Sequence, residues 1–329
     1  MNPVEKNLLI VGNIGPDTIC IEGQEPERKL GGSLTRIAVV AASYEYPAVM
    51  FGTLRQENGQ WEQLEPQLTQ NRVNTSYVVP FRVGIEFEEI YDRDFALVDL
   101  LVRQSSMQGV AVALFQEYIR NLIESGVQDE NFVTYICPLP PEMQEECVNA
   151  AREIGSVVAL TTHFNLLESH HNLDTFKRIL PKVDLLSLSS KEAQMITGEE
   201  SPIEAGSKLS GFSKKGLVFV TCAEKGAYAF YGEEMIVQLR PDFQDRVIDV
   251  TGAGDVFFGA TLVRMLQQGW DGETIDISMI VTAMEDAQRM VERKLKMFGF
   301  SEIIDPNELL SNNEDERSRV VETIFNCVC

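Results

Sequence analysis

The sequence has few basic residues for its length. Among 329 residues there are 28 lysines and arginines against 50 aspartates and glutamates, which gives a formal net charge of −22. This balance argues against general nucleic-acid binding and against docking on anionic lipid, because both need basic surface. A nucleotide substrate stays open, since backbone amides and a few local cations suffice to hold phosphates. We read the acidity itself as favouring solubility.

Long apolar runs and paired cysteine motifs are also missing. No apolar run reaches the length that crosses a membrane, and residues 1–6 lack the basic start of a secretory signal. We therefore expect a cytoplasmic protein with no membrane partner. The six cysteines show no paired metal-ligand spacing apart from Cys327 and Cys329. For these two a frayed tail is favoured over a metal or lipid site.

Two common nucleotide-binding motifs do not occur. There is no Gly-x-x-x-x-Gly-Lys-Ser/Thr, and no Gly-x-Gly-x-x-Gly follows the first predicted strand, which disfavours P-loop proteins and dinucleotide-dependent oxidoreductases. What the sequence does have is a regular alternation of short apolar runs with helical segments. The alternation predicts an α/β fold with a doubly wound, mostly parallel sheet, flanked by helices and binding ligands at the carboxyl ends of its strands.

The predicted elements follow this alternation along the whole chain. Strands are predicted at 8–12, 48–54, 133–138, 157–160, 184–188 and 217–221, with a hairpin at 228–231 and 236–239. Helices are predicted at 34–44 with Ser33 as N-cap, and at 59–70, 116–124, 141–154, 173–180, 191–197, 203–209, 253–267 and 274–296. Residues 75–103 are rich in β-branched and aromatic residues with charges between them, which predicts a small, partly exposed β element. The acidic stretch at 302–316 indicates a peripheral segment.

The most informative stretch is Asp249-Val250-Thr251-Gly252-Ala253-Gly254-Asp255, where an extended apolar segment turns into a predicted helix. The first turn of a helix has unpaired N–H groups and a partial positive charge, so it holds an anion, and small residues let the anion approach closely. Asp255 would repel a bound phosphate unless it had chemistry to perform, such as taking a proton from an attacking hydroxyl. An anion site with a base is the minimal equipment for phosphoryl transfer to an alcohol. The alternative interpretation is a tight turn with a capping aspartate.

This stretch resembles the signature of the ribokinase family, the PfkB-type kinases of sugars and nucleosides, with Val250 in place of a threonine. Three further stretches resemble family motifs in the family's order: the opening strand at 12–17, the double glycine at 31–32, and the strand and loop at 221–227. The resemblance implies one ribokinase-like domain over 1–329, with a β lid at about 13–30 and 75–103 and a peripheral segment at about 302–329. It also implies an ATP-dependent phosphotransferase acting on an alcohol group of a sugar, polyol or nucleoside.

The resemblance assigns roles to individual residues. Asp255 is the general base, and Gly252, Ala253 and Gly254 with it form the anion hole. Binding of the acceptor falls to Asp17, Gly31 and Gly32; binding of the nucleotide falls to Thr221, Lys225, Gly226 and Gly254. Glu192 would lie near Mg²⁺, and Asp249 near a monovalent cation. Several of these residues have an ordinary structural alternative. Asp17 would be a turn aspartate, Gly31 and Gly32 loop glycines, and Lys225 a solvated lysine. Glu192 would be a first-turn helix acid, and Asp249 an anchor of the loop.

Several positions depart from the family pattern. Ser33 follows the double glycine where asparagine or lysine is common, Ser189 replaces the asparagine of Asn-x-x-Glu, and Ala223 replaces a glycine. Ser33 leaves the identity of the acceptor open. Ser189, Ala223 and the unusual segment Thr161-Thr162-His163 keep a second hypothesis open, a catalytically weak kinase-derived binding or regulatory protein. Arg36, Arg93 and Arg103 are either surface residues or contacts for an acceptor's phosphate, and His163 has no assigned role.

A homodimer that pairs lid strands is compatible with the resemblance, but the imperfect alternation in residues 84–103 does not decide it. The catalytic hypothesis requires that Asp255 is not buried in a salt bridge and is not walled off from a cleft.

Overall fold

The structure is a computed structural model that describes residues 6–55, 59–82, 86–92, 97–103, 107–127, 131–212, 216–241, 245–300, 302–304 and 321–322. The strands of its main sheet are β1 (Asn7–Ile21), β3 (Ala48–Arg55), β4 (Val73–Phe81), β7 (Phe132–Ile136), β8 (Val157–Thr161), β9 (Leu185–Ser189), β10 (Leu217–Thr221), β11 (Ala227–Tyr231), β12 (Glu234–Leu239) and β13 (Val321–Glu322). Their order is β13-β12-β11-β10-β9-β8-β7-β1-β3-β4. Neighbours from β10 to β4 pair in parallel, whereas β11, β12 and β13 pair antiparallel.

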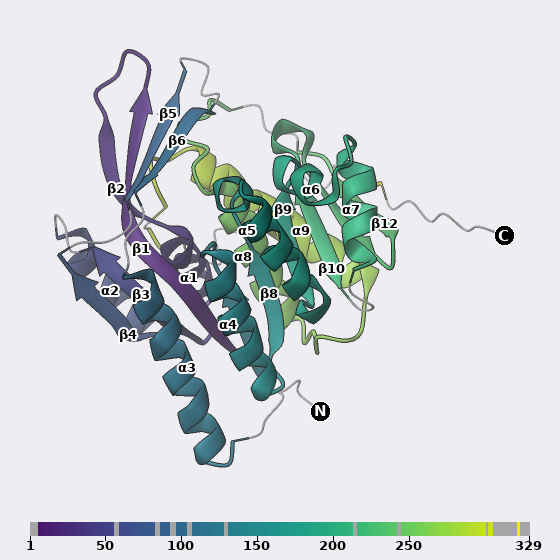
Figure 1. Ribbon diagram of the computed structural model, residues 1–329. Helices are drawn as coiled ribbons and strands as arrows, with labels where there is room; N and C mark the ends of the chain where they lie inside the picture. The colour runs from purple at the N-terminus through teal and green to yellow at the C-terminus, as the bar shows by residue number, and fades with distance from the viewer. Residues whose placement is uncertain are drawn as a thin grey trace.

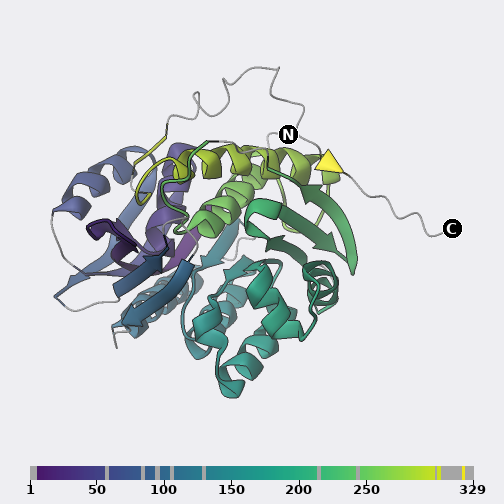
Figure 2. The ribbon, with the colours of Figure 1, turned by 90° about the horizontal axis from the view of Figure 1, so that it is seen from above.

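Helices cover both faces of this sheet (Figure 1, Figure 2). One face carries α1 (Ser33–Ser43), α2 (Gln60–Gln70), α8 (Ala253–Gln267) and α9 (Ile277–Leu295). The other carries α3 (Gln108–Glu124), α4 (Pro141–Glu153), α5 (His170–Ile179), α6 (Ser190–Thr197) and α7 (Pro202–Ser210). Short 3₁₀ turns lie at η1 (Phe164–Leu167), η2 (Leu180–Lys182) and η3 (Ala223–Lys225). The predicted doubly wound α/β fold is thus confirmed.

The first strand shows why this sheet must be covered on both sides. Leu8 and Ile10 are fully buried in the core under α1 and α8, and Leu9 and Val11 are fully buried in the core under α3 and α4. Successive strand residues point to opposite faces, so a continuous apolar run needs a helix layer on each face. Polar residues then fix where helices begin: Ser189 caps α6 and Asp276 caps α9.

Beyond the main sheet, β1 continues into a small second sheet. Its outer half pairs antiparallel with β2 (Glu27–Gly31) and parallel with β5 (Glu86–Tyr91), and β5 pairs with β6 (Leu97–Arg103). Figure 1 shows this sheet projecting from the end of the main sheet. Residues 77–79 were expected in the same element, but they lie in β4 and pair with β3. The small sheet therefore takes its later strands only from residues after Phe81.

Three boundaries also differ from the sequence prediction. Helix α3 begins at Gln108 rather than at residue 116, and α1 has Gly32 rather than Ser33 at its N-cap. The edge pair β12–β13 includes Val321 and Glu322, so part of the expected peripheral segment joins the main sheet. Arg93, Cys327 and Cys329 lie outside the described residues. Over the described part of the chain, no helix has both the length and the apolar character to cross a membrane.

Candidate active site

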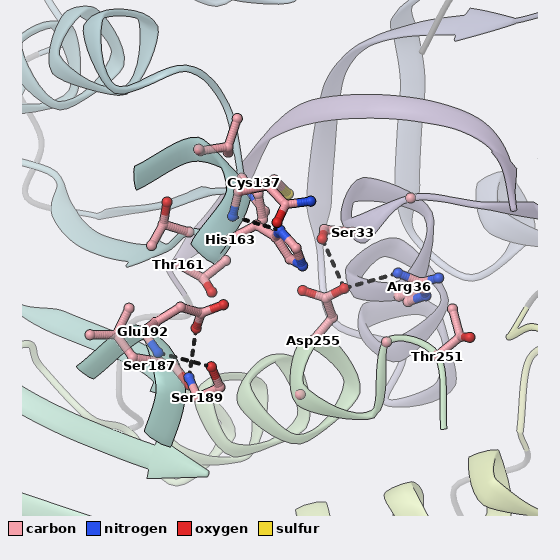
Figure 3. Close-up of a pocket in the computed structure, with 18 of the residues that line it drawn as sticks. Ser33, Arg36, Cys137, Thr161, His163, Ser187, Ser189, Glu192, Thr251 and Asp255 are labelled. Carbon is pink, nitrogen blue, oxygen red and sulfur yellow. Dashed lines mark hydrogen bonds and ion pairs between the residues drawn. The ribbon is translucent and has the colours of Figure 1, made fainter. Parts of the chain in front are cut away.

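A cavity of about 280 Å³ lies at the carboxyl ends of the parallel strands. Residues from β9 and β10, and from the segments that follow β7 and β8, line one side of it, and the first turns of α1 and α8 line the other (Figure 3). This is the position that a doubly wound sheet offers to a ligand. The cavity brings together residues that the sequence analysis selected separately: Asp17, Gly32, Glu192, Thr221, Gly252, Gly254 and Asp255.

Asp255 lies in the first turn of α8, and its carboxylate points toward α1 rather than capping its own helix. Its Oδ2 accepts a hydrogen bond from Ser33 Oγ at 2.8 Å and pairs with Arg36 Nη1 at 3.1 Å. The side chain is 13% exposed. Figure 3 shows the second carboxylate oxygen turned away from this pair and toward the cavity. Asp255 is therefore in a salt bridge, but it is only part-buried and lines the cavity, so it is neither buried in that pair nor walled off from the cleft.

The salt bridge extends to the acceptor-side aspartate. Arg36 also donates from Nη2 to Asp17 Oδ2, and the Arg36 and Asp17 side chains are only 7% and 2% exposed. We call the residues Asp17, Arg36 and Asp255 the Arg36 clasp. A Cβ on Gly252 would lie 2.1 Å from Arg36 Nε, so only glycine leaves room for the guanidinium there. Arg36 is thus not a surface arginine, since it is buried and lines the cavity. A contact between Arg36 and a phosphate of the acceptor stays a prediction.

The backbone of the α8 first turn offers N–H groups to an anion. Among the described residues no side chain caps this turn. The N–H of Ala253 donates to Val250 O at 3.1 Å, so Ala253 is not available as the sequence analysis expected. The N–H groups of Gly254 and Asp255 lie where no intrahelical carbonyl can reach them. A Cβ on Gly254 would meet nothing within 4 Å, so the space over this residue is open to a ligand.

Around Asp17 the structure adds a residue that the sequence analysis passed over. Gly31 is required there, because its Cβ would lie 2.0 Å from Asp17 Oδ2. Asn13 is 6% exposed, lines the cavity and accepts a hydrogen bond from Thr53 Oγ1 at 2.8 Å. Its Nδ2 is buried and has no hydrogen-bond partner among the described residues. Buried donors are normally satisfied, so this N–H is a candidate ligand contact.

Glu192 has the structural role that the sequence analysis kept as its alternative. Its Oε2 accepts from Ser189 N at 2.7 Å, and Ser189 Oγ accepts from Glu192 N at 3.3 Å, which makes a capping box for α6. Burial raises the pKa of Glu192, hydrogen bonds from Ser189 and Phe164 oppose the rise, and the charge of Asp255 adds to it. Serine suits the N-cap position, which accounts for its presence here.

The structure does not bring the nucleotide candidates together. Thr221 and Gly254 line the cavity, whereas Lys225 is exposed and it and Gly226 are not among the lining residues. Gly226 is required by the backbone, since its φ is +93° and a Cβ would lie 1.9 Å from Leu239 O. Ala223 takes φ +49°, a conformation that glycine adopts at less cost. This explains why a glycine suits that position.

His163 is a second functional candidate that the sequence did not assign. It lines the cavity, and burial, with a smaller contribution from the charge of Lys191, lowers its pKa to about 4. The ring is therefore neutral at neutral pH. Its Nδ1 accepts from Asn165 N at 3.4 Å, which leaves the proton on Nε2 as a donor. A lone histidine has no spacing signal in the sequence, so only the fold reveals it.

Asp249 is buried beneath the loop and does not line the cavity. Its Oδ2 pairs with Lys294 Nζ at 2.6 Å, and both side chains have 0% exposure. Burial by itself raises the pKa of Asp249, but the charge and hydrogen bond of Lys294 and hydrogen bonds from Thr251 outweigh it, so that the pKa lies below its ordinary value. A monovalent cation does not fit at this carboxylate, because the ammonium group already holds it.

Comparisons with known proteins place the chain in a family. Residues 9–277 match the pfkB family carbohydrate kinase. A cytidine kinase of Thermococcus kodakarensis is 31% identical over 131 residues, which are 40% of this chain and 46% of that protein. A 2-dehydro-3-deoxygalactonokinase of Haloferax volcanii is 27% identical over 172 residues, 51% of this chain and 50% of that protein. The matched regions therefore span about half the length of these curated relatives.

Solved structures share the fold over nearly the whole chain. A double mutant of Vibrio cholerae fructokinase, bound to fructose, ADP and potassium ion, superimposes with a TM-score of 0.75 at 18% identity, covering 94% of this chain and 99% of that one. The adenosine kinase of Sinorhizobium meliloti gives a TM-score of 0.71 at 16% identity, with the same coverage of 94% and 99%. At such low identity the likeness concerns the fold alone.

Proposed function

The chain belongs to the PfkB family of carbohydrate kinases, and we propose that it transfers the γ-phosphoryl group of ATP to a hydroxyl group of a sugar, polyol or nucleoside. One observation carries the proposal: a carboxylate oxygen of Asp255 faces the cavity beside the open first turn of α8 (Figure 3). A base and an anion site are thus adjacent. A kinase needs both within reach of one reacting centre.

The chemistry is divided between the side chain and the backbone of the same turn. The cavity-facing oxygen of Asp255 takes the proton of the acceptor hydroxyl, whose oxygen forms a bond to the γ-phosphorus. The bond from this phosphorus to the bridging oxygen breaks, and ADP leaves. The N–H groups of Gly254 and Asp255 stabilise the charge on the transferring group. Ala253 takes no part through its N–H, which donates to Val250 O.

The acceptor is assigned to the end of the cavity near β1. Asp17 supplies a carboxylate for acceptor hydroxyls, and Asn13 supplies the unpaired Nδ2 donor. Gly31 and Gly32 keep the backbone close to both. His163 lies on the side of Asp255 that is away from Arg36 (Figure 3), and we assign its Nε2–H as a donor to the acceptor molecule. Hydroxyl-bearing molecules need such alternating acceptors and donors, which supports a sugar, polyol or nucleoside over an apolar acceptor.

ATP is assigned to the part of the cavity lined by Thr221 and Gly254. Lys225 and Gly226 follow Thr221 in the chain but do not line the cavity, so no contact with ATP is assigned to them. No cluster of three metal-ligating side chains occurs in the described ranges, so a magnesium ion would be held mainly by phosphate oxygens and water. Glu192 fits a contact with such waters, since it lines the cavity. Bound Mg²⁺ would neutralise phosphate charge. The fructokinase relative holds a potassium ion, but here Lys294 occupies the carboxylate of Asp249, so we assign none.

The small sheet of β2, β5, β6 and the outer half of β1 is assigned as the lid of the ribokinase-like domain. It stands over the acceptor end, since Asp17 lies on β1 and Tyr91 on β5 and both line the cavity. Closing it over bound acceptor would exclude water, so that ATP is not hydrolysed. A homodimer through lid strands remains part of the proposal, to be checked by the mass in solution.

One observation favours a second function. Arg36 pairs with the carboxylate of Asp255, which the kinase needs as a base. A binding protein without turnover could keep this ion pair. ADP release across a panel of sugars, polyols and nucleosides separates the two, with ATP binding measured on the same sample. Acceptor-dependent ADP supports the kinase. ATP binding without acceptor-dependent ADP on any member of the panel would overturn the kinase in favour of the binding protein.

A further inference from the structure

The loop that leads into α8 rests on a fully buried cation. Asp249 begins this loop, and Lys294 lies in the last turn of α9, 45 residues further along the chain. Both side chains are 0% exposed. A second link joins the same segments, since Ile248 N donates to Leu295 O at 2.7 Å. The position of the α8 first turn therefore depends on what holds Asp249.

The ammonium of Lys294 binds Asp249 through two oxygens. Nζ donates to the carboxylate Oδ2 at 2.6 Å and to the backbone O of the same residue at 3.0 Å. Two backbone N–H groups also donate to the carboxylate of Asp249. Gly299 N donates to Oδ2 at 2.9 Å, and Thr251 N donates to Oδ1 at 2.8 Å. A carboxylate and a carbonyl converging on one positive charge are the ligands that a hard monovalent cation takes from proteins.

An isolated charge is expensive to bury, so a lysine with 0% exposure needs a specific partner. Lysine rarely occurs at such depth without one. A potassium ion and an ammonium group carry the same charge and are similar in size. The ion is coordinated by oxygen atoms, and the ammonium group donates hydrogen bonds to them. They therefore compete for the same place at Asp249.

We propose that Lys294 is a positioning residue that takes the place of a monovalent cation beneath the α8 first turn, so that this protein needs no potassium to order the loop. The ammonium is tethered to α9 and is present at every salt composition. The activity part of this inference rests on the proposed kinase function. The part that concerns loop order and stability does not.

The first experiment uses the unmodified protein and needs no variant. Thermal unfolding and acceptor-dependent ADP release are measured at equal ionic strength in KCl, NaCl, LiCl and N-methylglucamine chloride. The inference expects the same midpoint in all four, and rates that differ by less than about twofold, as screening alone allows. A midpoint or a rate that rises specifically with KCl would overturn it. If no acceptor gives ADP, the kinase proposal fails while the unfolding data still decide this one.

A variant provides the second readout. Lys294→Ser removes the ammonium and leaves an uncompensated buried carboxylate, which should lower the unfolding midpoint by on the order of 10 °C. KCl should then restore roughly 5 °C at saturation, and LiCl less, because a bound ion stabilises by mass action. Lys208→Ser, which breaks an exposed pair with Glu199, is the matched control and should show no ion-specific response. If the Lys294→Ser midpoint responds to KCl no more than that of Lys208→Ser, the inference is wrong.

Discussion

Replacing Arg36 by methionine tests whether the Arg36 clasp stabilises the site. Methionine keeps much of the volume and removes the charge, so the buried carboxylate of Asp17 and the part-buried carboxylate of Asp255 are left without their cation, with 2% and 13% of the side chains exposed. At an effective dielectric constant of about 20, unit charges 3.1 Å apart attract by about 5 kcal/mol. Desolvation offsets part of this attraction. Removing one partner of a buried pair costs about 3–5 kcal/mol, and we expect a loss of unfolding free energy in this range.

The measurement is urea unfolding followed by tryptophan fluorescence, since Trp61 and Trp270 are both buried. Arg178→Met is the matched control: Arg178 pairs with Glu145 at the surface, where solvent screens the interaction, so its removal should change little. Asp17→Asn introduced into Arg36→Met should recover part of the loss, because it removes one of the two unpaired charges. A loss below about 1 kcal/mol for Arg36→Met, in the range of ordinary surface changes, would refute the reasoning.

Two further predictions concern stability. In the folded protein the pKa of His163 is about 4, below its ordinary value of 6.5. Between these two pH values the unfolded chain therefore binds more protons than the folded protein. As the pH falls from 6.5 to 4, the wild type should lose up to about 3 kcal/mol of unfolding free energy relative to His163→Gln. Urea unfolding of both proteins at pH 7.5, 6 and 5 measures this, and parallel pH profiles would contradict it. Gly226→Ala should cost about 2–4 kcal/mol through its backbone conformation and its clash with Leu239 O. Gly232→Ala, with φ +60° and open space, should cost only about 1–2 kcal/mol, and equal losses would show that the clash has no effect.

The fold was largely predictable because its signals are local. Buried strands such as 217–221 are continuous apolar runs, and α8 begins at Ala253 as its glycines and helical spacing indicate. The first half of α3 was missed because Gly109 and the valines of this segment favour a helix less than the residues after 116. Residues 77–79 were assigned to the wrong sheet, since the same composition suits an edge strand of either.

The site was predictable where a motif carried it and not where distant segments meet. Asp255 and Gly254 follow from one stretch of sequence, and both line the cavity. The pairing of Arg36 with Asp255 joins positions 219 residues apart, and no periodicity reports such a contact. Lys294 gives the same difficulty: at the end of an amphipathic helix a lysine usually lies in solvent, and only the packing of α9 against the loop buries it.

The central claim is that Asp255 removes the acceptor proton, and Asp255→Asn tests it most directly. Once the panel has identified an acceptor, kcat is measured for the wild type, for Asp255→Asn and for Asp245→Asn, an exposed aspartate whose side chain is 62% exposed. ATP binding and the unfolding midpoint of each protein are measured in parallel, because the change also touches the Arg36 clasp. We expect kcat of Asp255→Asn to fall by about 10²–10⁴-fold with ATP still bound, the contribution of a general base. A folded Asp255→Asn protein that binds ATP and turns over at the wild-type rate would contradict the account.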